Sequence, residues 1–233
     1  MTTFSPARNE PIILSRSVEA KVYGFVALAM GLTLLGVYAG ILFATSLLSG
    51  GMFFILVIAE LAIILTSRLW ADRSPLNILL FCTFPLLSGL TVTPIILMVA
   101  TGYANGASIL FNAVASTAFM TAAAAVFART TRWNLGVLGK TLFLGILGLL
   151  FVGLLQVFFP SLRSGVMELV VSGAGVVLFA LFTAFDLQRI QQQSRLGANP
   201  FLLALSLYLD IFNLFLYVLR FMLAISGNRR QSW

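Results

Sequence analysis

The sequence has 233 residues, of which 60% are apolar and only 9% are charged, and its formal net charge is +7. Because soluble domains carry about a quarter charged residues, this composition excludes a soluble globular enzyme, a disordered chain and a disulfide-stabilised secreted domain. It indicates an integral membrane protein. A transmembrane helix needs about 20 apolar residues, and the chain offers candidate segments at 22–48, 52–70, 76–100, 107–128, 137–159, 165–190 and 201–225.

The breaks between these segments are short and rich in Gly, Pro, Ser and charged residues, and none has the length of a soluble domain. We therefore predict an all-α integral membrane protein with a single transmembrane domain over residues 22–225. Residues 1–21 are predicted to form a polar cytoplasmic tail and residues 226–233 a short C-terminal tail.

Positive charges gather at alternate breaks: Arg68 and Arg73, then Arg129, Arg132 and Lys140, then Arg189 and Arg195. The breaks after the first and third segments carry no charge. The positive-inside rule therefore predicts that the N-terminal tail and the basic loops face the cytoplasm. A spanning seventh segment would leave Arg229 and Arg230 outside, so this segment either crosses against a weak bias or re-enters the membrane.

Four aromatic residues near the predicted membrane surfaces are interpreted as anchors at the lipid headgroups: Tyr23, Trp70, Tyr103 and Trp133.

The chain has no histidine and a single cysteine, Cys82. The commonest general base and metal ligand is therefore missing, and any proton chemistry must use carboxylates. Because the cations occur singly or in pairs beside apolar segments, no nucleic-acid partner is expected.

Glu60 interrupts the second apolar segment near its middle. An ionised carboxylate facing lipid at this depth would be very unfavourable, so the side chain must be protonated, paired or turned toward an internal cavity. Two interpretations follow. Glu60 is either a neutral acid hydrogen-bonded between helices or a residue of an ion pathway or gate.

The seventh segment carries a polar stripe. Its members recur at spacings of four, three, four and three residues and so share one helical face: Ser206, Asp210, Asn213, Tyr217 and Arg220. A helix with such a stripe suits the centre of a bundle better than its lipid surface. The stripe either lines a pathway or forms interhelical hydrogen bonds.

Asp186 closes the sixth segment, and Asp210 follows 24 residues later in the seventh. Since one segment runs inward and the next runs back, the two carboxyl groups are expected at comparable depth. Two carboxylates that meet in a low-dielectric site share one proton rather than both ionise. Such a pair would sense pH without histidine, and its oxygens suit a hard cation such as Ca²⁺.

Three stretches near the C-terminus strongly resemble the signature of the Bax inhibitor-1 (transmembrane Bax inhibitor motif) family: FDLQRI at 185–190, ALSLYLDIFNLF at 204–215 and LRF at 219–221. The stretch LSGLT at 87–91, with Pro94, is similar to the third-helix motif of that family. Glu60 falls where the family often has an acid. The likeness to bacterial members extends from the second segment onward.

This resemblance implies a seven-helix bundle with six helices around a central C-terminal helix, in the inner membrane of a bacterium. It also implies a pH-sensitive Ca²⁺ leak gated by an aspartate pair, which maps onto Asp186 and Asp210. In relatives, an arginine near the end of the second helix latches one of these aspartates in the closed state. Ala71 takes that position here, so Arg68 or Arg73 would have to serve as the latch.

The leading hypothesis is a passive cation leak with Ca²⁺ as its transported or bound ion and with no other cofactor. Asp186 and Asp210 form its gate, and its pathway is lined by Glu60, Ser206, Asn213 and Arg220. The alternative is a non-transporting regulatory protein that binds a membrane protease complex or another partner. A third interpretation, an intramembrane aspartyl protease, lacks the flanking Gly-Asp motif, and no enzymatic activity is expected.

Overall fold

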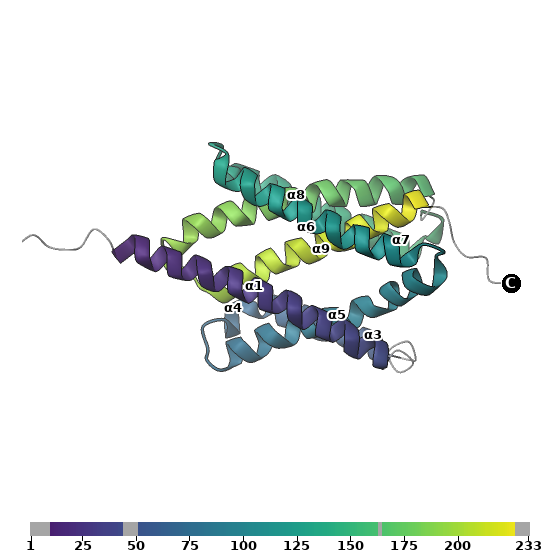
Figure 1. Ribbon diagram of the computed structural model, residues 1–233, viewed down its shortest axis with the longest axis horizontal. Helices are drawn as coiled ribbons and strands as arrows, with labels where there is room; N and C mark the ends of the chain where they lie inside the picture. Colours follow the sequence, from purple (N-terminus) through teal and green to yellow (C-terminus); the bar gives the residue numbers. More distant parts are fainter. Residues whose placement is uncertain (1–9, 44–50, 163–164, 227–233) are drawn as a thin grey trace, which may run out of the picture.

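The computed structural model describes residues 10–43, 51–162 and 165–226, which are helical nearly throughout and form no strand (Figure 1). The α-helices are α1 (Glu10–Leu42), α3 (Met52–Leu65), α4 (Ser67–Trp70), α5 (Leu76–Gly102), α6 (Gly106–Thr130), α7 (Gly139–Phe158), α8 (Gly165–Ser194) and α9 (Pro200–Ser226). Short 3₁₀ turns, η1 (Leu135–Leu138) and η2 (Pro160–Leu162), precede and follow α7. The predicted all-α class is confirmed.

Six of the described helices are long and apolar enough to cross a membrane. These are α1 from Val18 onward, α5, α6, α7 together with η1, α8 and α9. α3 has only 14 residues, a length of about 21 Å at the rise of an α-helix, which is shorter than a hydrocarbon core of about 30 Å. The sequence predicted one helix over 52–70. In the structure this segment is interrupted at Thr66 and continues as α4.

The first helix differs from the prediction at both ends. α1 begins at Glu10 rather than Val22, so the polar stretch predicted as a tail is helical from that residue. Glu, Lys and Arg are good helix formers, which explains why polarity alone does not end the helix. α1 ends at Leu42, and the rest of the predicted segment lies largely outside the described residues, as do the first nine residues and residues 227–233.

α1 and α5 approach each other closely at two glycines. A Cβ atom on Gly36 would overlap the carbonyl oxygen of Leu86, and one on Gly89 would overlap the carbonyl oxygen of Thr33.

α3 packs on α5. α7 contacts α8 but no other long helix to a comparable extent.

α9 is the most buried of the six long helices and contacts α1, α5, α6 and α8. In Figure 1 it runs between α1 and α5 on one side and α6 and α8 on the other. Its fully buried side chains include Tyr208, Leu214 and Leu219. A re-entrant segment would need a break in the helix, whereas α9 is continuous over 27 residues, which favours a crossing.

The anchor interpretation of the aromatic residues fails at two positions. Trp70 is 2% exposed and Tyr103 is 5% exposed. The Trp70 indole Nε1 donates to the carbonyl oxygen of Ile63 (3.0 Å). This hydrogen bond joins α4 to the end of α3, so the indole does not face the headgroups. Trp133, at 76% exposed, fits the anchor interpretation.

Candidate functional site

Asp186 of α8 and Asp210 of α9 lie together near the loop that joins these two helices. Gly197 in this loop has a φ of +71°, a conformation that glycine adopts readily, and the chain turns back there into α9. The two carboxyl groups are within hydrogen-bond range of each other, and the residues are 3% and 6% exposed. Because ionised carboxylates only accept hydrogen bonds, a bond between them requires a shared proton.

The two aspartates have unequal surroundings. Arg189 Nη1 lies 3.1 Å from Asp186 Oδ1, and the Ser206 hydroxyl also hydrogen-bonds to Asp186. Asp210 Oδ2 is buried and has no hydrogen-bond donor among the described residues. Asp186 thus has donors beside it, whereas no described donor reaches Asp210 Oδ2.

The structure does not bring Arg68 or Arg73 to this pair. Both residues are exposed, in α4 and in the link before α5. The ion pair with Asp186 is made by Arg189, one helical turn along α8. The sequence analysis counted Arg189 among the basic loop residues and within the FDLQRI stretch but gave it no role beside Asp186, although the spacing of three residues on one helix could have identified the pair.

Ala71 stands at the position where relatives have the latch arginine. It is buried, and its backbone carbonyl group makes the contacts described next. Its carbonyl oxygen accepts hydrogen bonds from Asn199 Nδ2 (2.9 Å) and Asn77 Nδ2 (3.3 Å). Asn199 Nδ2 also donates to Asp72 Oδ1 (2.6 Å). These bonds tie the link before α5 to the loop between α8 and α9.

Glu60 of α3 faces α5, where the Thr91 hydroxyl donates to Glu60 Oε1 (2.8 Å). It lies near enough to Tyr208 of α9 to affect it electrostatically. The Tyr208 hydroxyl is in turn 2.7 Å from Thr33 Oγ1 of α1 and hydrogen-bonds to Ser88 of α5. This polar network joins α1, α5 and α9 and lies close to Glu60.

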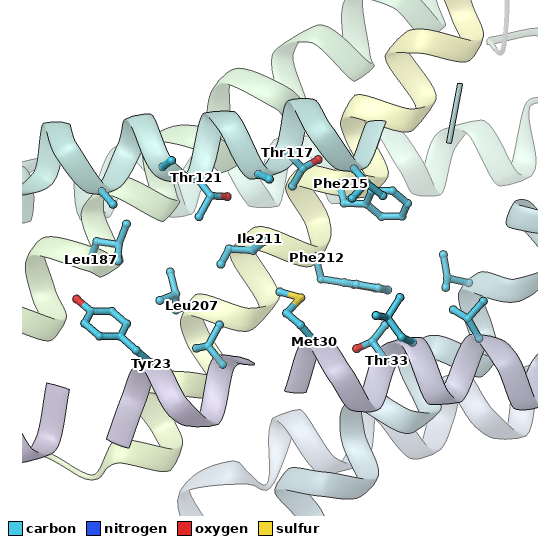
Figure 2. A pocket seen from close by; sticks show the side chains of 18 of the residues that line it. Tyr23, Met30, Thr33, Thr117, Thr121, Leu187, Leu207, Ile211, Phe212 and Phe215 are labelled. Carbon is cyan, nitrogen blue, oxygen red and sulfur yellow. The ribbon is translucent and has the colours of Figure 1, made fainter. Parts of the chain in front are cut away.

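A cavity of about 800 Å³ lies between α1 and α6, with α9 behind it (Figure 2). Its wall is almost entirely apolar, and none of the predicted gate or pathway residues lines it. Leu187 and Leu207, each next to one of those residues in sequence, do line it.

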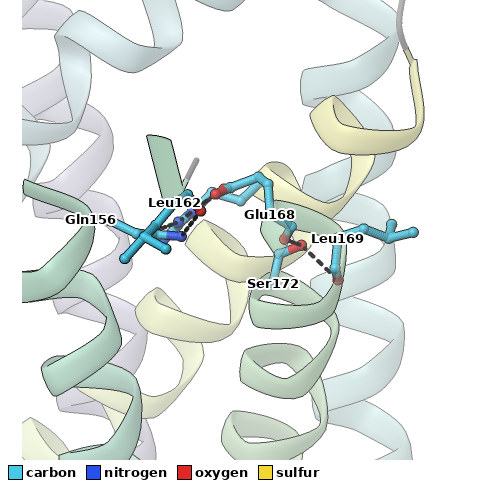
Figure 3. Close-up of polar contacts among 6 residues, drawn as sticks. Gln156, Leu162, Glu168, Leu169 and Ser172 are labelled. Carbon is cyan, nitrogen blue, oxygen red and sulfur yellow. Dashed lines mark hydrogen bonds and ion pairs between the residues drawn. The ribbon is translucent and has the colours of Figure 1, made fainter. Parts of the chain in front are cut away.

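Further along α9, Arg220 forms an ion pair with Glu168 of α8. Arg220 Nε lies 2.7 Å from Glu168 Oε1, and Nη2 lies 3.0 Å from Oε2. Arg220 Nη2 also reaches Gln156 Oε1 of α7 (3.3 Å), and its guanidinium lies 5.5 Å from the centre of the Tyr217 ring. Figure 3 shows Glu168 near the start of α8 and Gln156 across from it. The group borders a second cavity of about 680 Å³.

Asn213 of the predicted stripe hydrogen-bonds within its own helix, since its Nδ2 donates to the carbonyl oxygen of Leu209 (2.8 Å). Glu168 is a partner that sequence reasoning missed, because nothing in the spacing along the chain links residues of two different helices.

The candidate site offers few ligands for a tightly held metal ion. Within the described ranges no group of three or more His, Cys, Asp or Glu side chains could hold one. Ca²⁺ takes six to eight oxygen ligands. The aspartate pair with Ser206 could supply only part of that shell.

Residues 15–228 match the model of the family described as "Inhibitor of apoptosis-promoting Bax1". The chain belongs to the Bax inhibitor-1 family. It is 30% identical over 229 residues to protein Cj0236c of Campylobacter jejuni, covering 95% of this chain and 96% of that protein. It is 31% identical over 242 residues to inner membrane protein YbhL of Escherichia coli, covering 96% and 98% of the two chains.

Membership in the Bax inhibitor-1 family confirms the family predicted from the C-terminal stretches. The six long apolar helices and the inner-membrane relative support an integral protein of the bacterial inner membrane.

Proposed function

We propose that this Bax inhibitor-1 family protein is a passive cation leak that favours Ca²⁺ and is gated by a proton at the Asp186–Asp210 pair. The observation that carries the proposal is the burial of two adjoining carboxyl groups between α8 and α9, with Arg189 in an ion pair with Asp186. The proposal includes no catalytic step.

In the closed state, protonated Asp210 donates a hydrogen bond to ionised Asp186, whose charge Arg189 balances. When the pH rises and the proton leaves, two carboxylates face a single guanidinium in a space with little water. Their repulsion is strong there because the local dielectric is low. It separates α8 from α9 at this end and exposes oxygens that a passing Ca²⁺ can contact, so flux rises with pH.

The proposal places α9 at the centre of a seven-helix bundle in which α3 and α4 together count as one helix. The extensive burial of α9 and its contacts with four other helices support this arrangement. The ion pathway would follow the polar face of α9, from Ser206 past Asn213 toward Arg220, with Glu60 beside it. The distribution of Lys and Arg among the loops supports a cytoplasmic N-terminus.

The test is Ca²⁺ entry into liposomes that contain purified protein and a Ca²⁺-sensitive dye, measured from acidic to slightly alkaline pH. Wild-type flux should rise with pH. Asp210→Asn should stay at the low, acidic level throughout, because its amide donates to Asp186 at every pH. Asp72→Asn, the same change at an exposed acid, keeps an oxygen that accepts from Asn199 and should follow the wild type.

Either of two results would contradict the gate: a wild-type flux equal to that of empty liposomes, or an unchanged pH profile in Asp210→Asn. A folded protein that carries no flux would favour the alternative, in which the protein binds a membrane protease complex or another partner. Affinity purification from membranes would test for such a partner.

A further inference from the structure

The cavity between α1 and α6 is a groove along two helices that scarcely touch. α1 packs on α5, α8 and α9, and α6 packs on α5, α8 and α9, but α1 and α6 are not a packed pair. Leu207, Ile211 and Phe212 of α9 close the groove from behind (Figure 2). Leu34 on the α1 wall and Val114 on the α6 wall are largely exposed, so the groove is accessible from the side that faces lipid.

The dimensions of the groove suit one hydrocarbon chain. Its α1 wall extends from Tyr23 to Val37, which corresponds to about 21 Å at the rise of an α-helix. The hydrocarbon of one leaflet is about 15 Å thick. The groove therefore accommodates an acyl chain over its full depth in the leaflet.

Polar groups gather at one end of this apolar wall. Arg129, in the last turn of α6, lines the groove together with Gln191 of α8 and Tyr23 of α1. This is the end at which α8 joins α9, because α6 and α8 finish there and α1 passes through it. Arg129 is exposed, and no described acid forms an ion pair with it.

Two residues that line the groove carry hydroxyl groups without partners. Tyr23 Oη and Thr121 Oγ1 are buried and have no hydrogen-bond partner among the described residues, although both residues line the groove and project into it (Figure 2). Thr117, one turn earlier in α6, bonds to the carbonyl oxygen of Ala113 (2.7 Å), whereas Thr121 makes no such bond. Buried polar groups are nearly always hydrogen-bonded, and a rotation of either side chain toward the groove would let its hydroxyl donate to an acceptor oxygen of a ligand there.

We propose that the groove binds one anionic glycerophospholipid, with an acyl chain between α1 and α6 and its phosphate against Arg129. After such a rotation the ester and phosphate oxygens of the lipid can accept from these hydroxyls, and basic pockets between helices at the cytoplasmic side bind anionic headgroups. The site is independent of the proposed leak, since no gate residue lines it.

Native mass spectrometry of the full chain tests the site. The purified protein is equilibrated in micelles that contain equal amounts of phosphatidylglycerol and phosphatidylethanolamine, and the lipid retained on gentle activation is identified. Wild type should retain one phosphatidylglycerol in preference to phosphatidylethanolamine. Arg129→Gln should lower phosphatidylglycerol retention about fivefold, as expected for one cation at a membrane surface, and Arg132→Gln, outside the groove, should not.

A second pair of variants separates the acyl chain from the headgroup. Ala122 lines the groove and Ala123 does not, so Ala122→Phe should abolish retention of either lipid while Ala123→Phe retains the wild-type level. Should Ala122→Phe fail to fold, the comparison of Arg129→Gln with Arg132→Gln decides alone. Equal retention of the two lipids by wild type, equal loss in Arg129→Gln and Arg132→Gln, or a protein dimer that Ala122→Phe dissociates would overturn the proposal.

Discussion

Tyr208 shows how a single side chain joins helices that are distant in the sequence. It is completely buried in α9, and its hydroxyl meets Thr33 of α1 at 2.7 Å. The Thr33 hydroxyl also donates to the carbonyl oxygen of Ala29 in its own helix (2.9 Å). Tyr208 Oη can therefore donate to Thr33 Oγ1 while Thr33 donates along α1, and both hydroxyls are satisfied.

A double-mutant cycle of Tyr208→Phe and Thr33→Val should give a coupling free energy of about 1 kcal/mol, the usual scale for a hydrogen bond between membrane helices. The measurement is reversible unfolding in mixed micelles. Each single variant should lose stability, and the double variant should lose less than their sum. Strict additivity would mean that the two hydroxyls do not interact.

Arg189 is expected to set the pH at which the proposed gate opens. Without its charge, ionised Asp186 is less favourable, so the pair keeps its proton to higher pH. Arg189→Gln should therefore move the rise in Ca²⁺ flux toward higher pH by about one unit, and Arg189→Lys should restore most of the wild-type profile. A profile that Arg189→Gln leaves in place would show that the guanidinium does not influence the pair.

For single residues, the sequence predicted which polar side chains lie inside the bundle better than it predicted the partners of those side chains. The stripe on α9 was visible from spacing alone, and Asp210 and Arg220 both find polar partners on α8. Glu168 could not be matched to Arg220, because that pairing depends on how α8 and α9 are aligned along each other. Gln188 was also missed, although it binds the loop before α7 by donating to the Trp133 carbonyl oxygen (2.9 Å) and accepting from Leu135 N (2.8 Å).

At the scale of whole helices, the contact between α1 and α5 depends on the absence of side chains. Gly36 and Gly89 let the two backbones approach until Cβ atoms would overlap carbonyl groups. Small residues serve in this way throughout membrane proteins, where close van der Waals contact replaces the hydrophobic effect as the force between helices.

Gly89→Ala should destabilise the protein by about 1–3 kcal/mol, the usual penalty for overpacking. Gly31→Ala in α1 is the matched control, because a Cβ there meets nothing within 4 Å; it should be neutral or slightly stabilising, since alanine favours helix. Unfolding of both variants in the same micelles checks the pair. Equal stability of the two variants would disprove the close contact.

The ends of the helices could be predicted where proline or glycine marks them. The prediction failed where no such residue is present. Pro75 directly precedes α5 and the glycine-rich turn at 102–106 separates α5 from α6, as turn chemistry predicts. The interruption at Thr66 was not foreseen, because no Gly or Pro marks it. The groove between α1 and α6 was equally unforeseen, since it arises from the angle between helices.

For the molecule as a whole, the placement of loops on the two sides of the membrane is the central expectation. The link between α5 and α6 has no charge, whereas Arg195 lies in the loop between α8 and α9. The positive-inside rule therefore assigns these two loops to opposite sides, with α8 and α9 meeting in the cytoplasm.

Single cysteines introduced into a Cys82→Ser background test this orientation. Asn105→Cys should react with a membrane-impermeant maleimide in intact spheroplasts. Leu196→Cys, at a residue 84% exposed in the other loop, should react only after the membrane is opened. The reverse pattern would invert the topology, and labelling of both sites in intact spheroplasts would exclude an odd number of crossings between them.

The alignment of α8 with α9 has a consequence for biosynthesis. Glu168 near the start of α8 pairs with Arg220 of α9, the helix that follows it in the chain. A nascent chain enters the bilayer in order, and Glu168 arrives before its guanidinium has left the ribosome. An unmatched acid in hydrocarbon is unfavourable. A chain truncated before Pro200 would therefore keep Glu168 and lose the guanidinium that pairs with it.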